Sequence, residues 1–98
     1  MKQAISPSGV FSANIKSLRK KDNRYHLILE VEADYPTTIS IDVHDSICET
    51  AGISDISSDL KKKIFSNFPS TIKVSNLNGY WKIQNESQLL SDIISRLL

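Results

Sequence analysis

Residues 25–33, with the sequence YHLILEVEA, decide the fold of this chain. Every second side chain in this stretch is apolar, and most of the side chains between them are polar or charged. The apolar series is Tyr25, Leu27, Leu29, Val31 and Ala33. A period of two is typical of a β-strand, so the stretch predicts a strand with one face on a core and the other open to solvent or to a partner.

Similar runs lie on both sides of this strand. Phe11, Ala13 and Ile15 alternate with polar residues before it, and the run from Thr37 to Val43 alternates after it. The link KKDN at 20–23 has the polar composition of a hairpin loop. The three runs therefore predict an antiparallel meander with one buried face.

Helical signals follow the third run. A short helical turn is expected to end at Gly52, and a firmer helix is expected to begin at Ser54 or Ser57 and to end before Pro69. The apolar residues of this helix recur at helical spacing: Ile56, Leu60 and Ile64.

Asn78-Gly79 is the strongest turn signal in the chain. Both residues tolerate the positive φ of a type I′ turn, so runs 71–77 and 80–84 should pair as a hairpin. A last helix is expected after Asn85, which would act as its N-cap, with Gln88 in the capping-box position.

The predicted fold is a single α+β domain over residues 1–98. It consists of an antiparallel three-stranded meander, a helix, a β-hairpin with an Asn-Gly turn and a C-terminal helix, with the helices packed on one sheet face. Residues 1–8 are expected to form a loose N-terminal arm.

The composition is that of a globular domain, with 98 residues of which 40% are hydrophobic and 23% charged. No apolar run is long enough to cross a membrane, and a single cysteine, Cys48, cannot form an internal disulfide. A cytoplasmic location is therefore expected. Plentiful Ser, Ile, Asn and Lys with few Gly and Ala indicate AT-rich coding sequence, which favours a phage or mobile-element origin.

Charge is segregated along the chain. The segment from Tyr25 to Leu60 contains no Lys or Arg, whereas both flanks are basic. Its acidic residues are Glu30, Glu32, Asp34, Asp42, Asp45, Glu49, Asp55 and Asp59. Such segregation bears on the choice of partner, because the field outside a protein depends on where its charge lies.

The acidic segment predicts a non-catalytic protein-interaction module, such as a small inhibitor, immunity or accessory protein that binds a basic partner. The contact would be the outward face of the second and third strands, with Ile28 as an apolar anchor. The residues of this face are His26, Ile28, Glu30, Glu32, Asp42 and His44. A solvated face that prevents edge-to-edge aggregation is the simpler explanation of the same pattern.

The basic flanks support an alternative, a nucleic-acid-binding accessory domain. Cations of the first hairpin loop would contact phosphates, and the outer face of the second hairpin would add an aromatic side chain. The residues of this alternative site are Arg19, Lys20, Lys21, Arg24, Lys73, Tyr80 and Lys82. Solvated charges at a sheet end would give the same pattern.

Neither a metal site nor an active site is expected. His44 and Cys48 are too few ligands for zinc, although Asp45 and Glu49 lie beside them. No glycine-rich phosphate loop is present. We therefore expect no cofactor and no enzymatic activity.

The C-terminal helix has aliphatic residues over about half of its circumference. Either the helix lies deep across the sheet, or Leu90, Ile94 and Leu97 contact another chain, for instance in a homodimer.

Overall fold

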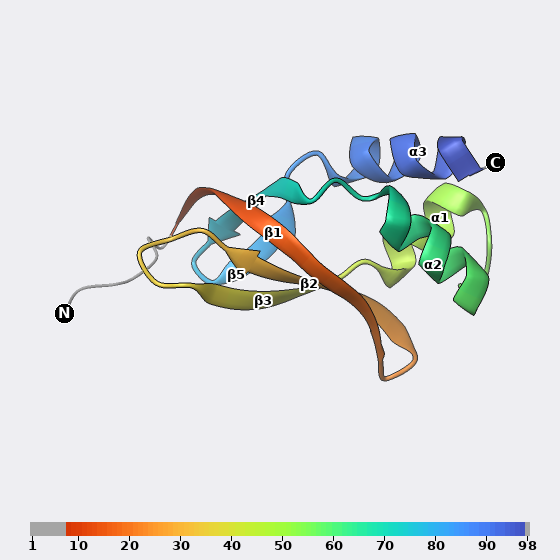
Figure 1. The fold of residues 1–98 in the computed structure, drawn as a ribbon, viewed down its shortest axis with the longest axis horizontal. Coiled ribbons are helices and arrows are strands. Elements are labelled where there is room, and N and C mark those ends of the chain that lie inside the picture. Colours follow the sequence, from red (N-terminus) through yellow and green to blue (C-terminus); the bar gives the residue numbers. More distant parts are fainter. Residues whose placement is uncertain (1–7, 98) are drawn as a thin grey trace.

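The computed structural model describes residues 8–97 and has the predicted α+β fold. Three helices gather at one end of a twisted sheet, where α3 contacts both α1 and α2 (Figure 1). The elements are β1 (Ser8–Lys21), β2 (Arg24–Val31), β3 (Thr37–Asp42), α1 (His44–Ala51), α2 (Ser58–Asn67), β4 (Thr71–Leu77), β5 (Tyr80–Ile83) and α3 (Glu86–Leu97). No helix in residues 8–97 is long and apolar enough to cross a membrane.

The five strands form one antiparallel sheet in the order β3-β2-β1-β4-β5, so the strand count differs from the predicted three-stranded meander. The cause is β1, which is 14 residues long and pairs with β4 through Ser8–Asn14 and with β2 through its second half. Because β4 returns to lie beside β1, the connectivity is that of a Greek key. Of the predicted loose arm, residues 1–7 lie outside the described residues, and Ser8 begins β1.

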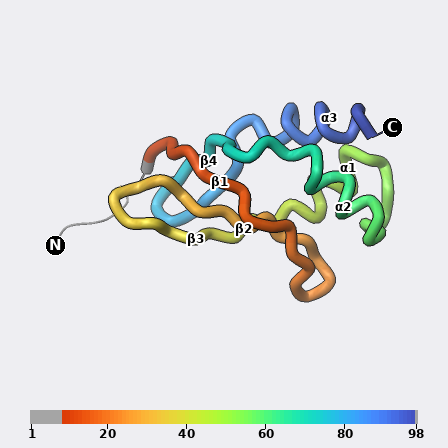
Figure 2. Tube along the Cα trace, viewed as in Figure 1, coloured from red at the N-terminus to blue at the C-terminus, as the bar shows by residue number. Residues whose placement is uncertain are grey.

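A β-bulge bends the long strand β1. The register with β2 shifts between Ile15 and Ser17, which leaves Lys16 as the extra residue. Bulges increase the local twist of a strand, and here the sheet curls until its two edge strands, β3 and β5, come into contact (Figure 2). The sheet is therefore a partly open barrel whose edges face each other without a ladder between them.

The core lies inside this curl and under the helices. The predicted alternation of β2 is confirmed, since Leu27 and Leu29 are fully buried, whereas Ile28 between them is not. The helices add Ile47 from α1 and Ile64 from α2. Burial of each such side chain contributes about 1.5–3 kcal/mol.

The helix boundaries follow the predicted signals in part. Gly52 ends α1 with φ of 68°, and the Ser57 hydroxyl caps α2 by accepting from the Leu60 amide at 3.1 Å. The predicted N-cap of α3 is different, because Asn85 has φ of 57° rather than an extended conformation, and the Gln88 amide donates to Asp92 Oδ1 at 2.9 Å.

The aliphatic face of α3 is largely buried within the monomer. Leu90 and Ile94 are 0% and 4% exposed, and Leu97 packs against the core as a partly buried residue. Burial in the core, where α3 contacts α1 and α2, thus accounts for the wide apolar face of this helix.

Candidate nucleic-acid interface

The outer face of the sheet carries most of the predicted site residues. His26, Ile28 and Glu30 alternate outward along β2, and the register with β3 sets His26 opposite Asp42 and Ile28 opposite Ser40. His44 is not on this face. β3 ends at Asp42, so His44 lies beyond the strand. The Nδ1 atom of His44 accepts a hydrogen bond from the Tyr25 amide at 3.4 Å.

Two acidic residues of this face, Glu30 and Asp42, are paired with cations from β1 and β2. Lys16 Nζ lies 3.1 Å from Glu30 Oε1, and Arg24 Nε lies 2.6 Å from Asp42 Oδ2. Arg24 also reaches Asp45, with Nη2 at 2.8 Å from Oδ2. The hydrogen bond from Arg24 lowers the pKa of Asp42 below its usual range, so the carboxylate is charged and neutralised by the same partner.

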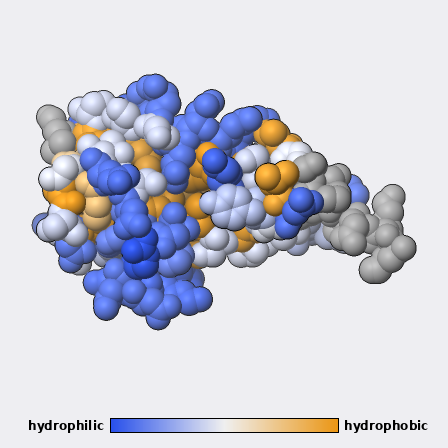
Figure 3. Space-filling model, turned by 180° about the vertical axis from the view of Figure 1, so that it is seen from behind, coloured by the Kyte–Doolittle hydropathy of each residue, from blue (hydrophilic) through white to orange (hydrophobic). Residues whose placement is uncertain are grey.

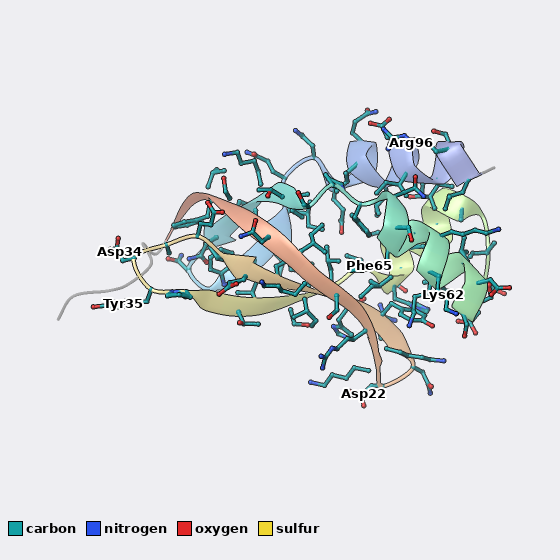
Figure 4. All side chains as sticks on the ribbon, in the orientation of Figure 1. Asp22, Asp34, Tyr35, Lys62, Phe65 and Arg96 are labelled. Atoms are coloured by element: carbon teal, nitrogen blue, oxygen red, sulfur yellow. The ribbon has the colours of Figure 1, made fainter. Side chains whose placement is uncertain are left out.

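The cations at the tip of the first hairpin lack such partners. Arg19, Lys20 and Lys21 are exposed and form no ion pair with any acid in residues 8–97. Arg19 Nε donates to Ser17 Oγ at 3.3 Å, and Lys20 Nζ lies 5.9 Å from the centre of the Tyr25 ring. The projecting end of this hairpin forms a hydrophilic protrusion, with Asp22 at its tip (Figures 3 and 4).

These cations border a hollow of about 320 Å³ between the β1–β2 hairpin and β3, which we call the basic hollow. Ile28, predicted as the anchor for a basic partner, lines this hollow beside the three cations. The lining residues are Arg19, Lys20, Lys21, His26, Ile28 and Ser40. A pocket with three cations, a histidine and one aliphatic side chain suits an anionic ligand better than a basic one.

A second hollow of about 320 Å³, the seam hollow, lies where β3 meets the β4–β5 hairpin. Its lining residues are Ser40, Ile41, Asp42, Gly79, Tyr80 and Trp81. Ser40 lines both hollows, so the two form neighbouring parts of one surface across β3.

The remaining cations of the predicted nucleic-acid site do not join the basic hollow. Lys73 Nζ donates to Ser12 Oγ at 3.0 Å and borders a separate hollow between β4 and α3. Lys82 borders a further hollow at the start of α3, and Arg24 is held by Asp42 and Asp45. The structure therefore brings together Arg19, Lys20 and Lys21, with Tyr80 in the adjoining seam hollow.

The residues with metal or nucleophile chemistry form no site in the described part of the chain. Residues 8–97 hold no group of three or more His, Cys, Asp or Glu side chains placed to bind a metal ion. Burial raises the pKa of the Cys48 thiol, with the nearby carboxylates of Asp55 and Asp45 adding to the effect. A thiol with a raised pKa is a poor nucleophile.

Sequence reasoning missed two residues of this surface, Ser40 and Trp81. The Trp81 ring packs against Phe11 with centroids 5.7 Å apart. Its place beside β3 depends on the curl of the sheet, for which the local sequence carries no signal. Comparisons with protein-family models, with curated proteins and with solved structures found no match for this chain.

Proposed function

We propose that this chain is a nucleic-acid-binding accessory domain that holds phosphate groups at the basic hollow. One observation carries the proposal: three exposed cations without acidic partners surround a hollow on the outer face of the sheet. Arg and Lys side chains of this kind make the sequence-independent phosphate contacts that dominate affinity for nucleic acids.

The acidic segment is compatible with this function because its charge is dispersed and partly neutralised. Glu30 and Asp42, which share the outer face with the basic hollow, are each paired with a cation. Glu49 and Asp59 belong to the helices instead, on α1 and α2. The repulsion that the acids of residues 25–60 would exert on a phosphate chain is therefore weakened at the hollow itself.

The test is fluorescence anisotropy with a labelled single-stranded oligonucleotide of about 12 nucleotides, within the site sizes of single-strand binders. The triple variant R19A/K20A/K21A should lose most of the affinity of the wild type at low salt. A matched control is K61A/K62A/K63A on α2, which removes the same charge from the helices.

The control triple should bind nearly as well as the wild type, because only the charges at the hollow contact phosphate. Equal loss in both triples would mean that binding follows net charge rather than this site. The absence of binding by the wild type at low salt would refute the proposal.

A second candidate, binding of a basic protein partner, is supported at the opposite end of the sheet. Glu32 and Asp34 are exposed there beside Tyr35, which is 65% exposed (Figure 4). Acidic groups around an exposed aromatic ring are typical of a contact surface for a basic partner. Charge reversal at Glu32 and Asp34 should reduce capture of basic proteins from a cell extract, and the reversal D59K on α2 should not.

A further inference from the structure

We propose that the seam hollow between β3 and the β4–β5 hairpin is a nucleobase-binding site, so that the ligand of the basic hollow is a single strand. This inference rests on the proposed function, because the seam hollow adjoins the basic hollow through Ser40. A nucleic-acid strand whose phosphates lie at the basic hollow would extend across β3 and place its next bases in the seam hollow.

Two aromatic side chains make the seam suitable for a planar base. Tyr80 is 68% exposed, and Trp81 is partly buried. The Trp81 ring is held in place by its contact with Phe11, at an interplanar angle of 55°. Stacking of bases on such rings tolerates every base, because each base has a π-face.

Polar groups at the seam match the edges of a base. The seam lies between β3 and β5, the two edge strands, which carry no ladder with each other and so present backbone N–H and C=O groups. The Ser40 hydroxyl makes no hydrogen bond within residues 8–97 and is available as donor or acceptor.

The one acid at the seam does not oppose an anionic strand. Asp42 Oδ2 is bound by Arg24, and its Oδ1 accepts from the His44 amide at 2.9 Å. Its charge is thus offset by the Arg24 guanidinium and the His44 amide.

The seam has room for one small planar group. Its volume, about 320 Å³, is at the lower end of the range for small-ligand pockets. A base can enter only when it is splayed out of a stack, which a single strand permits and an intact duplex does not. The ligand class is therefore single-stranded nucleic acid rather than a duplex.

Trp81 makes this inference directly testable, because it is the single tryptophan of the chain. The protein is titrated with an oligothymidylate and, separately, with inorganic polyphosphate, which carries the charge but no bases. Both probes should bind, and the oligothymidylate alone should quench the fluorescence of Trp81. A duplex of equal length should leave the fluorescence near its starting value.

The variant Y80A should weaken binding of the oligothymidylate by about 5- to 100-fold and leave polyphosphate binding unchanged. Leu77→Ala is the matched control, since Leu77 is 63% exposed and pairs with Tyr80 across the hairpin but does not line the seam. It should change neither affinity. Circular dichroism of both variants checks that the fold is retained.

Two results would overturn the inference, and they are distinguishable. If the oligothymidylate binds without quenching Trp81 and Y80A behaves like L77A, the base site is wrong while the proposed phosphate site stands. If neither probe binds the wild type, the proposed function itself fails and the base site fails with it.

Discussion

The two hairpins of the molecule have nearly the same turn and opposite surface chemistry. The β1–β2 turn has φ of 54° and 62° at Asp22 and Asn23, and the β4–β5 turn has φ of 53° and 90° at Asn78 and Gly79. The first hairpin ends in exposed cations, whereas the second exposes Leu77 and Tyr80. Turn geometry therefore fixes the register of each hairpin, and the residues beside the turn decide what each end can bind.

The curl of the sheet brings the two chemically different hairpins to opposite sides of β3. β3 pairs with β2 of the first hairpin and contacts β5 of the second. Ser40 on β3 consequently borders both the basic hollow and the seam hollow. The end proposed to bind phosphate and the end proposed to bind bases are thus brought to one surface by elements that are far apart in the sequence.

The largest expected effect is a difference in stability between substitutions on the buried face and on the outer face of the first hairpin. Leu27→Ala should lower the free energy of unfolding by about 2–5 kcal/mol, because it leaves a cavity where Leu27 is 0% exposed. Ile28→Ala, one residue along, removes a side chain from the outer face and should cost less than about 1 kcal/mol. Urea unfolding of both variants measures the difference, and equal losses would contradict the assignment of Ile28 to the basic hollow.

A smaller effect is expected from the turn of the second hairpin. Gly79→Ala should destabilise the protein by about 1–2 kcal/mol, because a residue with a Cβ is strained at φ of 90°, although no atom lies within 4 Å of the added Cβ. Asn23→Gly in the first hairpin should change stability little, since glycine readily adopts φ of 62°. Thermal unfolding compares the two, and a neutral Gly79→Ala would show that this turn is not held in its positive-φ form.

The smallest expected effect concerns the ion pair between Arg24, which follows the turn of the first hairpin, and Asp42 on β3. The pKa of Asp42 is lowered in the folded state by Arg24, so the pair contributes stability above pH 3.8, the ordinary value for this carboxyl, and the contribution is lost as the pH falls through the folded pKa. Both side chains are more than a third exposed, so the contribution is small. Arg24→Gln should be slightly less stable than the wild type at pH 7, and the two unfolding curves should converge in acid. A constant gap across pH would assign the loss to packing instead.

The local elements were predictable from the sequence, whereas their assembly was not. Alternation over residues 25–33 and the Asn78-Gly79 turn are local properties, and the structure confirms both. The reach of β1 to β4 and the bulge at Lys16 depend on long-range pairing, so the separate meander and hairpin of the prediction merge into one sheet.

The charge pattern shows the same limit at the candidate site. Lys16 and Glu30 lie 14 positions apart in the sequence and Arg24 and Asp42 lie 18 apart, yet antiparallel pairing makes both into ion pairs. Acidic and basic residues that are segregated along the sequence therefore lie side by side on the surface. Arg19, Lys20 and Lys21, which form no ion pair in the described residues, were each predicted as site residues. The sequence did not indicate that these three would lie apart from Arg24, Lys73 and Lys82.

The most direct test of the phosphate site is the salt dependence of oligonucleotide binding by the wild type. Three phosphate contacts predict that log affinity falls against log salt with a slope of about −2, or roughly a 15-fold loss between about 50 and 200 mM salt. The R19A/K20A/K21A variant should show a slope near zero. A wild-type affinity that is insensitive to salt, or a slope that the variant retains, would contradict the central claim that the basic hollow binds the phosphates of a nucleic acid.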